Sequence, residues 1–133
     1  MGLNANQNQN KWKNHHFIQA LRHALDGVRT AFREERNLRF HCCAAVGVVV
    51  CGFLFRLTCS EWLWLLAAVT LVVVSELWNT VAENLADLAS HLQRDELAKK
   101  AKDIAAGAVL VAAGFAVLVA VFVFGPHILA LMK

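Results

Sequence analysis

The fold of this chain is decided by residues 62–87, which read WLWLLAAVTLVVVSELWNTVAENLAD. The stretch is almost wholly apolar as far as Val74, which is typical of a helix that crosses a membrane. Trp62 and Trp64 stand at its start, where aromatic side chains of membrane helices gather at the interface. After Val74 the helical pattern continues to Asp87 with polar residues. We therefore predict a membrane span with a polar extension at its C-terminal end.

Two further apolar stretches predict two more spans. One covers about residues 40–58, and its uncharged part is the 16 residues between Arg39 and Arg56. At about 1.5 Å per residue it is somewhat short for a hydrocarbon core of about 30 Å, so both arginines should reach toward the interface. The other covers residues 104–132 and contains no Asp, Glu, Lys or Arg. Pro126 is expected to end or kink this third span.

The segment before the first span is predicted to be a helix on the membrane surface. Residues 16–36 carry a narrow apolar stripe at helical spacing, and basic residues occupy the other faces. Such a helix suits the interfacial plane, although packing on a soluble partner would give the same pattern. Residues 1–15 form a polar tail, and its Asn- and Gln-rich part from Asn4 to Asn10 is expected to be frayed or disordered. The apolar stripe consists of Phe17, Leu21, Leu25, Val28, Ala31 and Phe32.

The composition agrees with a small helical membrane protein. Of the 133 residues, 58% are hydrophobic and 17% are charged, whereas soluble domains are about 45–50% apolar and about 25% charged. With one proline and seven glycines, the chain has few turn-forming residues, which disfavours a loop-rich or all-β fold. The four cysteines form no C-x-x-C pair, so neither a disulfide framework nor a metal cluster is predicted. The predicted fold is one all-α integral membrane domain over residues 16–133, with a surface helix and three spans.

The distribution of basic residues predicts the orientation in the membrane. Lysines and arginines gather before the first span and again between the second and third spans. By the positive-inside rule both regions face the cytoplasm, so the N-terminus is inside and the C-terminus is outside. The residues that carry this signal are Lys11, Lys13, Arg22, Arg29, Arg33, Arg36, Arg39, Arg94, Lys99, Lys100 and Lys102.

One face of the polar extension is acidic. At about 100° per residue, four polar residues fall within about 80° of one another. Glu76 is still near or inside the membrane boundary, where a carboxylate is costly and indicates function by default. A helix end that emerges into water would also carry charges, but it would mix Lys and Arg into this face. The four residues are Glu76, Asn79, Glu83 and Asp87.

Cations follow the acidic face along the chain. Residues 98–103 read AKKAKD and lead directly into the third span. Carboxylates near phosphates usually hold Mg²⁺ and lysines act as compact cations, so the combination indicates a nucleoside triphosphate with its metal. A lysine cluster can also be a topogenic signal alone. No G-x-x-x-x-G-K-[ST] or G-x-G-x-x-G motif is present, so a P-loop or conventional protein-kinase site is excluded.

Two other classes of function also fit an acidic membrane helix. A proton-coupled transporter uses acids inside the membrane, but here they lie toward one boundary rather than at the midplane. In a non-catalytic scaffold the charges would only assemble helices. No nucleic-acid partner is expected.

At these residues the chain resembles the small bacterial integral-membrane lipid kinases, the prokaryotic diacylglycerol kinase and undecaprenol kinase family. The resemblance covers about residues 17–120 and centres on the pattern E-x-x-N-T-x-x-E-x-x-x-D, which begins at Glu76. Two further blocks agree, ERNLRFH at residues 35–41 and AKKAKDIAAGAVL at residues 98–110. These two blocks look more like the undecaprenol kinase branch.

The resemblance implies a homotrimer in the bacterial cytoplasmic membrane that transfers the γ-phosphate of ATP to a lipid hydroxyl. The lipid would be undecaprenol, with diacylglycerol as the alternative. Glu76 matches the general base that accepts the hydroxyl proton, and Glu35 and Glu83 match the acids that hold Mg²⁺ on the nucleotide. Further matches to nucleotide contacts are Asn79, Asp87, Asp95, Glu96, Lys102 and Asp103.

The same resemblance implies contacts to the nucleotide base and to the lipid headgroup. His23 stands where one branch has an aromatic residue near the adenine, so it is expected to contact ATP. Asn37 and Arg39 are expected to contact the lipid substrate together with Glu76. His41, which closes the same block, is expected to have a structural role at the interface.

Overall fold

The computed structural model describes the backbone of residues 3–132 and the side chains of residues 16–132. α1 forms one compact unit and the residues from Glu35 onward form a second, so each unit is described by itself. The prediction of an all-helical protein is confirmed for this part of the chain. Its helices are α1 (Leu3–Glu34), α2 (Arg36–Leu54), α3 (Cys59–Ala89) and α4 (Glu96–Leu131).

α1 is longer than the sequence pattern predicted. It begins at Leu3 rather than at residue 16 and ends at Glu34, so the segment expected to be a frayed tail is helical from Leu3 onward. Asn and Gln are tolerated in helices, and no proline interrupts this segment. The position of α1 on a membrane surface stays a prediction. Of the apolar stripe, Ala31 is buried, and the exposed residues are Phe17, Leu21, Leu25, Val28 and Phe32.

The second unit contains three helices that are long and apolar enough to cross a membrane, namely α2, α3 and α4. Their bounds differ from the predicted spans because hydrogen bonds, not apolar residues, set the ends of a helix. α2 begins and ends earlier than residues 40–58, and α3 extends beyond residues 62–87 at both ends. α4 begins well before residue 104, because Asp95 Oδ1 accepts a hydrogen bond from the Ala98 amide at 2.8 Å and caps the helix.

α4 continues through Pro126 and ends at Leu131. Of the two expected effects of this proline, an end or a kink, the helix end is therefore wrong, and the kink stays a prediction. Proline removes one backbone donor and crowds the preceding turn, which breaks most helices in water. In a membrane helix, neighbouring groups and local adjustment of the backbone satisfy the freed carbonyl, so the helix can continue.

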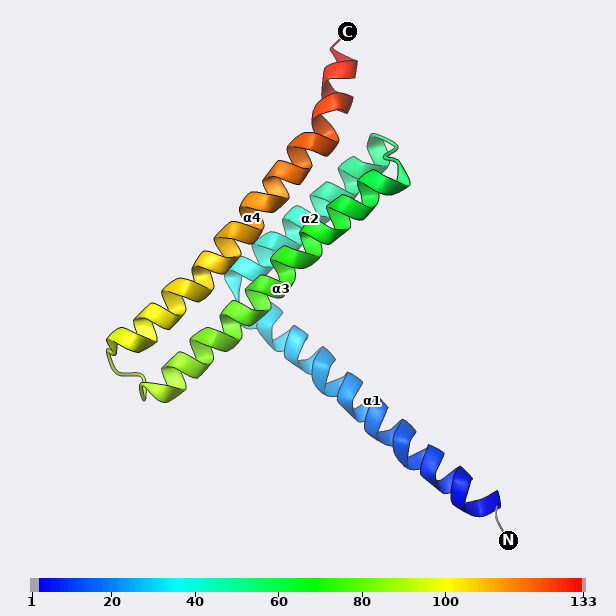
Figure 1. The fold of residues 1–133 in the computed structure, drawn as a ribbon, viewed down its shortest axis with the longest axis vertical. Coiled ribbons are helices and arrows are strands. Elements are labelled where there is room, and N and C mark those ends of the chain that lie inside the picture. The colour runs from blue at the N-terminus through cyan, green and yellow to red at the C-terminus, as the bar shows by residue number, and fades with distance from the viewer. Residues whose placement is uncertain (1–2, 133) are drawn as a thin grey trace. The chain divides into compact units, whose positions relative to one another are not determined.

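α3 is the central helix of the second unit and packs against both α2 and α4. Figure 1 shows α3 and α4 running side by side. Short turns join consecutive helices and make them antiparallel neighbours. Both turns contain residues with positive φ, which are Arg56, His91 and Leu92. The apolar core lies where the α2–α3 turn, α3 and α4 meet, and it consists of Leu57, Leu65, Ala68, Val119 and Val123.

One carboxylate ties the α2–α3 turn to α4. The Thr58 amide donates to Glu61 Oε2 at 2.7 Å, which forms part of a capping box at the start of α3. The other oxygen of Glu61, Oε1, lies 2.9 Å from His127 Nε2 on α4. Glu61 therefore uses both oxygens for structural contacts.

Gly52 allows α2 to approach α3 closely. A Cβ at this position would lie 2.6 Å from Trp62 Cη2, and the Trp62 ring already packs on Phe53 with 5.0 Å between ring centroids. We expect Gly52→Ala to lower the free energy of unfolding by about 1–3 kcal/mol through overpacking. Gly47→Ala is the matched control, because no atom lies within 4 Å of a Cβ built there. Thermal unfolding in detergent tests this, and equal midpoints for the two variants would contradict the packing.

Candidate functional site

The inward face of α3 changes from apolar to polar partway along the helix. Leu65 and Val72 are buried in the N-terminal part of this stripe, and Glu76, Asn79 and Thr80 are buried further along it. The residue exposures of these three polar side chains are 3%, 7% and 7%. Polar groups that leave water without partners cost free energy, so this end of the stripe is not explained by packing alone.

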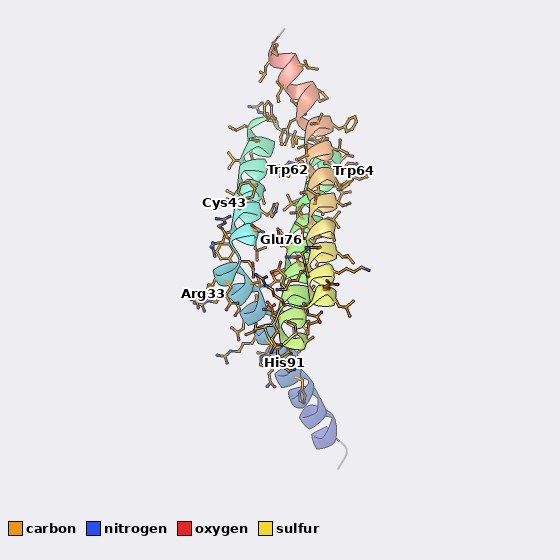
Figure 2. All side chains as sticks on the ribbon, turned by 90° about the vertical axis from the view of Figure 1, so that its left-hand side faces the viewer. Arg33, Cys43, Trp62, Trp64, Glu76 and His91 are labelled. Atoms are coloured by element: carbon orange, nitrogen blue, oxygen red, sulfur yellow. The ribbon has the colours of Figure 1, made fainter. Side chains whose placement is uncertain are left out.

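Glu76 lies along α3 between Trp62, near the start of the helix, and His91, in the turn after its end (Figure 2). Its side chain is 4% exposed, and His41 Nε2 on α2 lies 3.1 Å from Glu76 Oε1. Buried carboxylates are normally hydrogen-bonded in this way because the loss of hydration must be offset. The structure therefore presents the predicted base as a buried acid that an adjacent helix contacts.

Two other carboxylates lie within electrostatic range of Glu76. They belong to Glu35, which precedes α2, and to Glu83, which follows Glu76 on α3. Like charges at close range disfavour the ionised forms unless cations or protons are added. Glu35 and Glu83 thus act electrostatically on Glu76, and a cation bound near these acids would offset their repulsion.

Asn79 forms a hydrogen bond with one of these acids. Its Nδ2 donates to Glu83 Oε1 at 2.9 Å, and the neighbouring Thr80 Oγ1 donates to the Glu76 carbonyl oxygen at 3.1 Å. The other amide atom, Asn79 Oδ1, is buried and has no hydrogen-bond partner among the described residues. An unsatisfied buried acceptor costs about 1–3 kcal/mol, so Asn79 Oδ1 is suited to accept a donor or a cation from a ligand.

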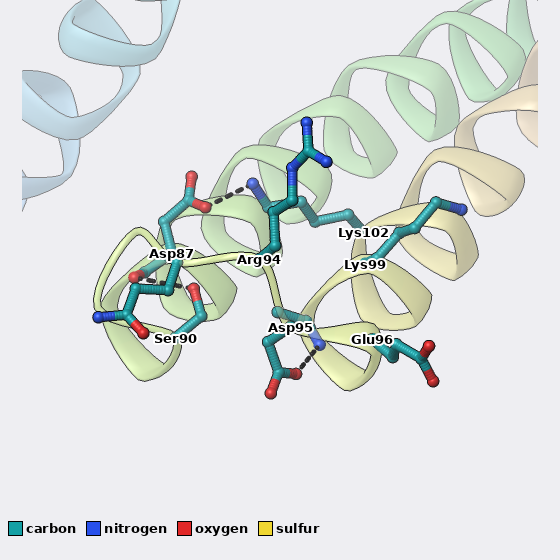
Figure 3. A pocket seen from close by; sticks show the side chains of 9 residues that line it. Asp87, Ser90, Arg94, Asp95, Glu96, Lys99 and Lys102 are labelled. Carbon is teal, nitrogen blue, oxygen red and sulfur yellow. Dashed lines mark hydrogen bonds and ion pairs between the residues drawn. The ribbon is translucent and has the colours of Figure 1, made fainter.

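A pocket of about 700 Å³ opens where α3 turns into α4. Figure 3 shows acidic and basic side chains on its walls. Lys102 Nζ lies 2.5 Å from Asp87 Oδ1 and thereby joins α4 to the acidic face of α3. The pocket therefore offers basic side chains to a polyanion and acidic side chains to a cation that is bound to it. The charged residues that line the pocket are Asp87, Arg94, Asp95, Glu96, Lys99 and Lys102.

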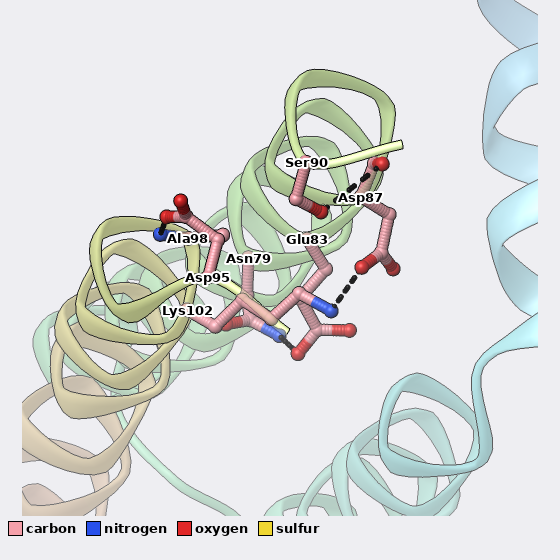
Figure 4. A network of polar contacts seen from close by, with 7 residues as sticks. All are labelled: Asn79, Glu83, Asp87, Ser90, Asp95, Ala98 and Lys102. Atoms are coloured by element: carbon pink, nitrogen blue, oxygen red, sulfur yellow. Dashed lines mark hydrogen bonds and ion pairs between the residues drawn. The ribbon is translucent and has the colours of Figure 1, made fainter. Parts of the chain in front are cut away.

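The structure brings most of the predicted nucleotide residues to this end of the second unit. Asp87, Asp95, Glu96 and Lys102 line the pocket. Figure 4 shows Asn79 and Glu83 beside Asp87 on α3, next to the amine of Lys102.

Asp103 lies apart from the pocket. Its side chain is 63% exposed and pairs with Lys99 at 2.7 Å. Successive residues on a helix point about 100° apart, so Lys102 can face α3 while Asp103 faces outward. Asp103 thus contacts the pocket through Lys99, which lines it, and its expected contact with the nucleotide stays a prediction.

The remaining predicted contacts stay predictions. Asn37 and Arg39 lie in the first turn of α2, close in sequence to His41, and Asn37 is exposed. His23 belongs to α1 and so to the first unit, which is described separately.

Several side chains at the site were not assigned to it from the sequence, and His41 and Arg94 are two of them. His41 was expected to have a structural role at the interface, but it contacts Glu76. Arg94 was assigned only to the orientation signal, but it lines the pocket. A pattern within one helix does not reveal a partner on another helix, so the sequence carried no sufficient signal for either residue.

The chemistry of the donors fits a magnesium ion that arrives with a nucleotide. Among the described residues, no group of three or more Asp, Glu, His or Cys side chains is arranged to hold a metal by itself. Mg²⁺ usually binds through one or two carboxylates and takes its other ligands from phosphates and water. Glu83, next to the unpaired Asn79 Oδ1, offers oxygen donors of this kind.

Several known kinases are similar in sequence to this chain. The family model for prokaryotic diacylglycerol kinase matches residues 22–124. An undecaprenol kinase from Bacillus subtilis is 38% identical over 112 residues, which cover 84% of this chain and 90% of that protein. A diacylglycerol kinase from Synechocystis is 41% identical over 113 residues, covering 85% of this chain but 65% of that protein. A diacylglycerol kinase from Haemophilus influenzae is 30% identical over 97 residues, which cover 73% of this chain and 81% of that protein.

Proposed function

Since the chain belongs to the prokaryotic diacylglycerol kinase family and is a membrane lipid kinase, we propose that it phosphorylates the hydroxyl of undecaprenol with ATP. Family membership favours an enzyme over the transporter and the scaffold. The relative named undecaprenol kinase supports the choice of lipid, because it corresponds to this chain along nearly its whole length. Diacylglycerol is the alternative substrate, because two diacylglycerol kinases are also similar.

The burial of Glu76 is the observation that carries the proposed chemistry. A carboxylate that is 4% exposed and sits on a membrane helix can meet a hydroxyl that approaches from the bilayer. Glu76 would accept the hydroxyl proton while the lipid oxygen forms its bond to the γ-phosphorus. The bond from that phosphorus to the bridging oxygen breaks, and ADP leaves with its electrons. Contacts to the lipid headgroup are assigned to Asn37 and Arg39.

The pocket between α3 and α4 is the proposed nucleotide site. Its cations, above all Lys102, would neutralise phosphate charge, which is the main contribution of a protein to phosphoryl transfer. Asn79, Asp87, Asp95, Glu96 and Asp103 are assigned to ATP by the family pattern, and His23 to the adenine. The pocket supports this assignment for Asp87, Asp95 and Glu96, and the unpaired Oδ1 supports it for Asn79.

Glu35 and Glu83 are the residues proposed to hold Mg²⁺ on the nucleotide. When bound, the ion supplies charge neutralisation of the phosphates during transfer. Glu83 is held in place for this task by its hydrogen bond from Asn79. Glu35 lies at the junction before α2, within electrostatic range of the same acidic region.

We further propose a multi-pass protein of the bacterial cytoplasmic membrane. Three candidate spans place the two termini on opposite sides, and the basic residues assign the N-terminus to the cytoplasm. A homotrimer follows from the family pattern. A small-residue face on α4 supports close packing between subunits, because no atom lies within 4 Å of a Cβ built at Gly107 or Gly114.

The choice of lipid is tested by offering both lipids to the purified protein. In separate vesicles with equal mole fractions of undecaprenol or diacylglycerol, we expect kcat/KM to favour undecaprenol by about tenfold or more, equivalent to about 1.4 kcal/mol. The readout is the initial rate of lipid phosphate formation. Faster phosphorylation of diacylglycerol would replace the proposed substrate by the alternative and would leave the assignment as a lipid kinase intact.

A further inference from the structure

The face of α2 that packs inward holds a polar residue in an otherwise apolar stripe. Leu38 is 2% exposed and Gly52 is also buried, while Val48 packs against the core. These residues recur at helical spacing, so they share one side of α2. His41 lies on the same side with its side chain 21% exposed. Apolar packing with α3 does not require a histidine at this position.

The contact of His41 with Glu76 has the geometry of a hydrogen bond. His41 Nε2 lies 3.1 Å from Glu76 Oε1, and an ionised carboxylate can only accept. With Glu76 ionised, as its proposed role as the base requires, the imidazole donates from Nε2. Its ring is also packed edge-on against Phe40, with 5.6 Å between centroids and 74° between planes. Contacts on two sides fix the direction in which the donor points.

We propose that His41 is a positioning residue for phosphoryl transfer, which holds one carboxylate oxygen of Glu76 so that the other meets the lipid hydroxyl. The inference rests on the proposed role of Glu76 as the base. A base works only within hydrogen-bond reach of the proton that it removes, and small displacements reduce the rate steeply. Glu76 comes from α3 and His41 from α2, so their bond fixes the base relative to two helices.

The second histidine–glutamate pair of the protein gives the contrast. His127 contacts Glu61, but Glu61 also binds the Thr58 amide and hydroxyl at the start of α3. That pair therefore has a structural task at the other end of α3. It offers a matched control, with the same residue types and a similar distance but no link to the proposed site.

Activity measurements on His41 variants test the proposal. We expect His41→Ala to lower kcat by about ten- to a hundredfold, with KM for ATP and for undecaprenol within about twofold. His41→Gln, which keeps an amide donor at similar reach, should restore much of the loss. In the Glu76→Gln background, His41→Ala should lower the residual rate no further. His127→Ala should leave kcat within about twofold.

Several results would overturn the positioning role. One is turnover of His41→Ala within twofold of the unmodified protein. Another is a loss of kcat in His41→Ala that His41→Gln fails to restore, when His41→Ala also loses as much thermal stability as His127→Ala. A further loss in the Glu76→Gln background would show that His41 acts independently of the base.

Nitrogen NMR of the histidine rings tests the pairing without any turnover. Glu76→Gln should move the ring ¹⁵N signals of His41 and leave those of His127 in place, and Glu61→Gln should do the reverse. Unmoved His41 signals would refute the pairing even if the lipid kinase reaction is observed. If the unmodified protein labels neither lipid, the proposed function fails, and the NMR result still decides whether His41 holds Glu76.

Discussion

Replacing Glu76 by glutamine is expected to lower kcat by about 10³-fold while ATP still binds with nearly unchanged affinity. Glutamine keeps the size and hydrogen-bonding reach of the side chain but cannot take up the hydroxyl proton. His41 can still donate to the amide oxygen, so the local fold should persist. Steady-state kinetics with undecaprenol gives kcat, and equilibrium binding of ATP gives the affinity.

Glu61→Gln is the matched control for this substitution. Glu61 is the other glutamate of α3 that contacts a histidine, and it lies at the far end of the helix from the pocket. We expect lower thermal stability in this variant because the cap and the contact with α4 weaken, but little change in kcat. Turnover by Glu76→Gln within tenfold of the unmodified protein would show that another group, or water, removes the proton.

Lys102→Met is expected to lower kcat/KM for ATP by about 100-fold, which corresponds to about 2.7 kcal/mol of transition-state stabilisation. Methionine keeps most of the length of lysine but removes the charge that we assign to the phosphates. The loss also leaves Asp87 without its cation on the wall of the pocket, so a nucleotide would meet net repulsion. Initial rates at varied ATP concentration measure the effect.

The control for Lys102 is Lys100→Met. Lys100 lies in the same lysine cluster of α4, but it is exposed and is not among the residues that line the pocket. Its replacement removes one positive charge from this region and should change kcat/KM by less than about threefold. Equal losses in the two variants would mean that the general positive field of the cluster matters, not the contact between Lys102 and α3.

The sequence was most informative about α3. The apolar run and the polar face from Glu76 to Asp87 share one helix, so their relation follows from a period of about 3.6 residues per turn. The structure keeps Glu76 and Asn79 buried on that face. Helix ends were harder to predict. The cap at Asp95 moves the start of α4 far ahead of its apolar run, and Pro126 does not stop it.

Contacts between helices could not be read from the sequence. His41 meets Glu76 and Lys102 meets Asp87 because of how α2 and α4 are rotated against α3. That rotation follows from packing along the whole length of the helices, including close approach at Gly52. It also turns Asp103 outward to Lys99. The residue types at the site were thus predictable, but their partners were not.

The most direct test of the account follows labelled phosphate from γ-labelled ATP into vesicles that contain undecaprenol, the purified protein and Mg²⁺. We expect the label to appear in undecaprenyl phosphate, with no label retained on the protein, because Glu76 accepts a proton and forms no bond to phosphorus. Glu76→Gln should abolish this labelling and Glu61→Gln should retain it. Labelled lipid formed equally well by Glu76→Gln, or label that remains on the protein, would contradict direct transfer with Glu76 as the base.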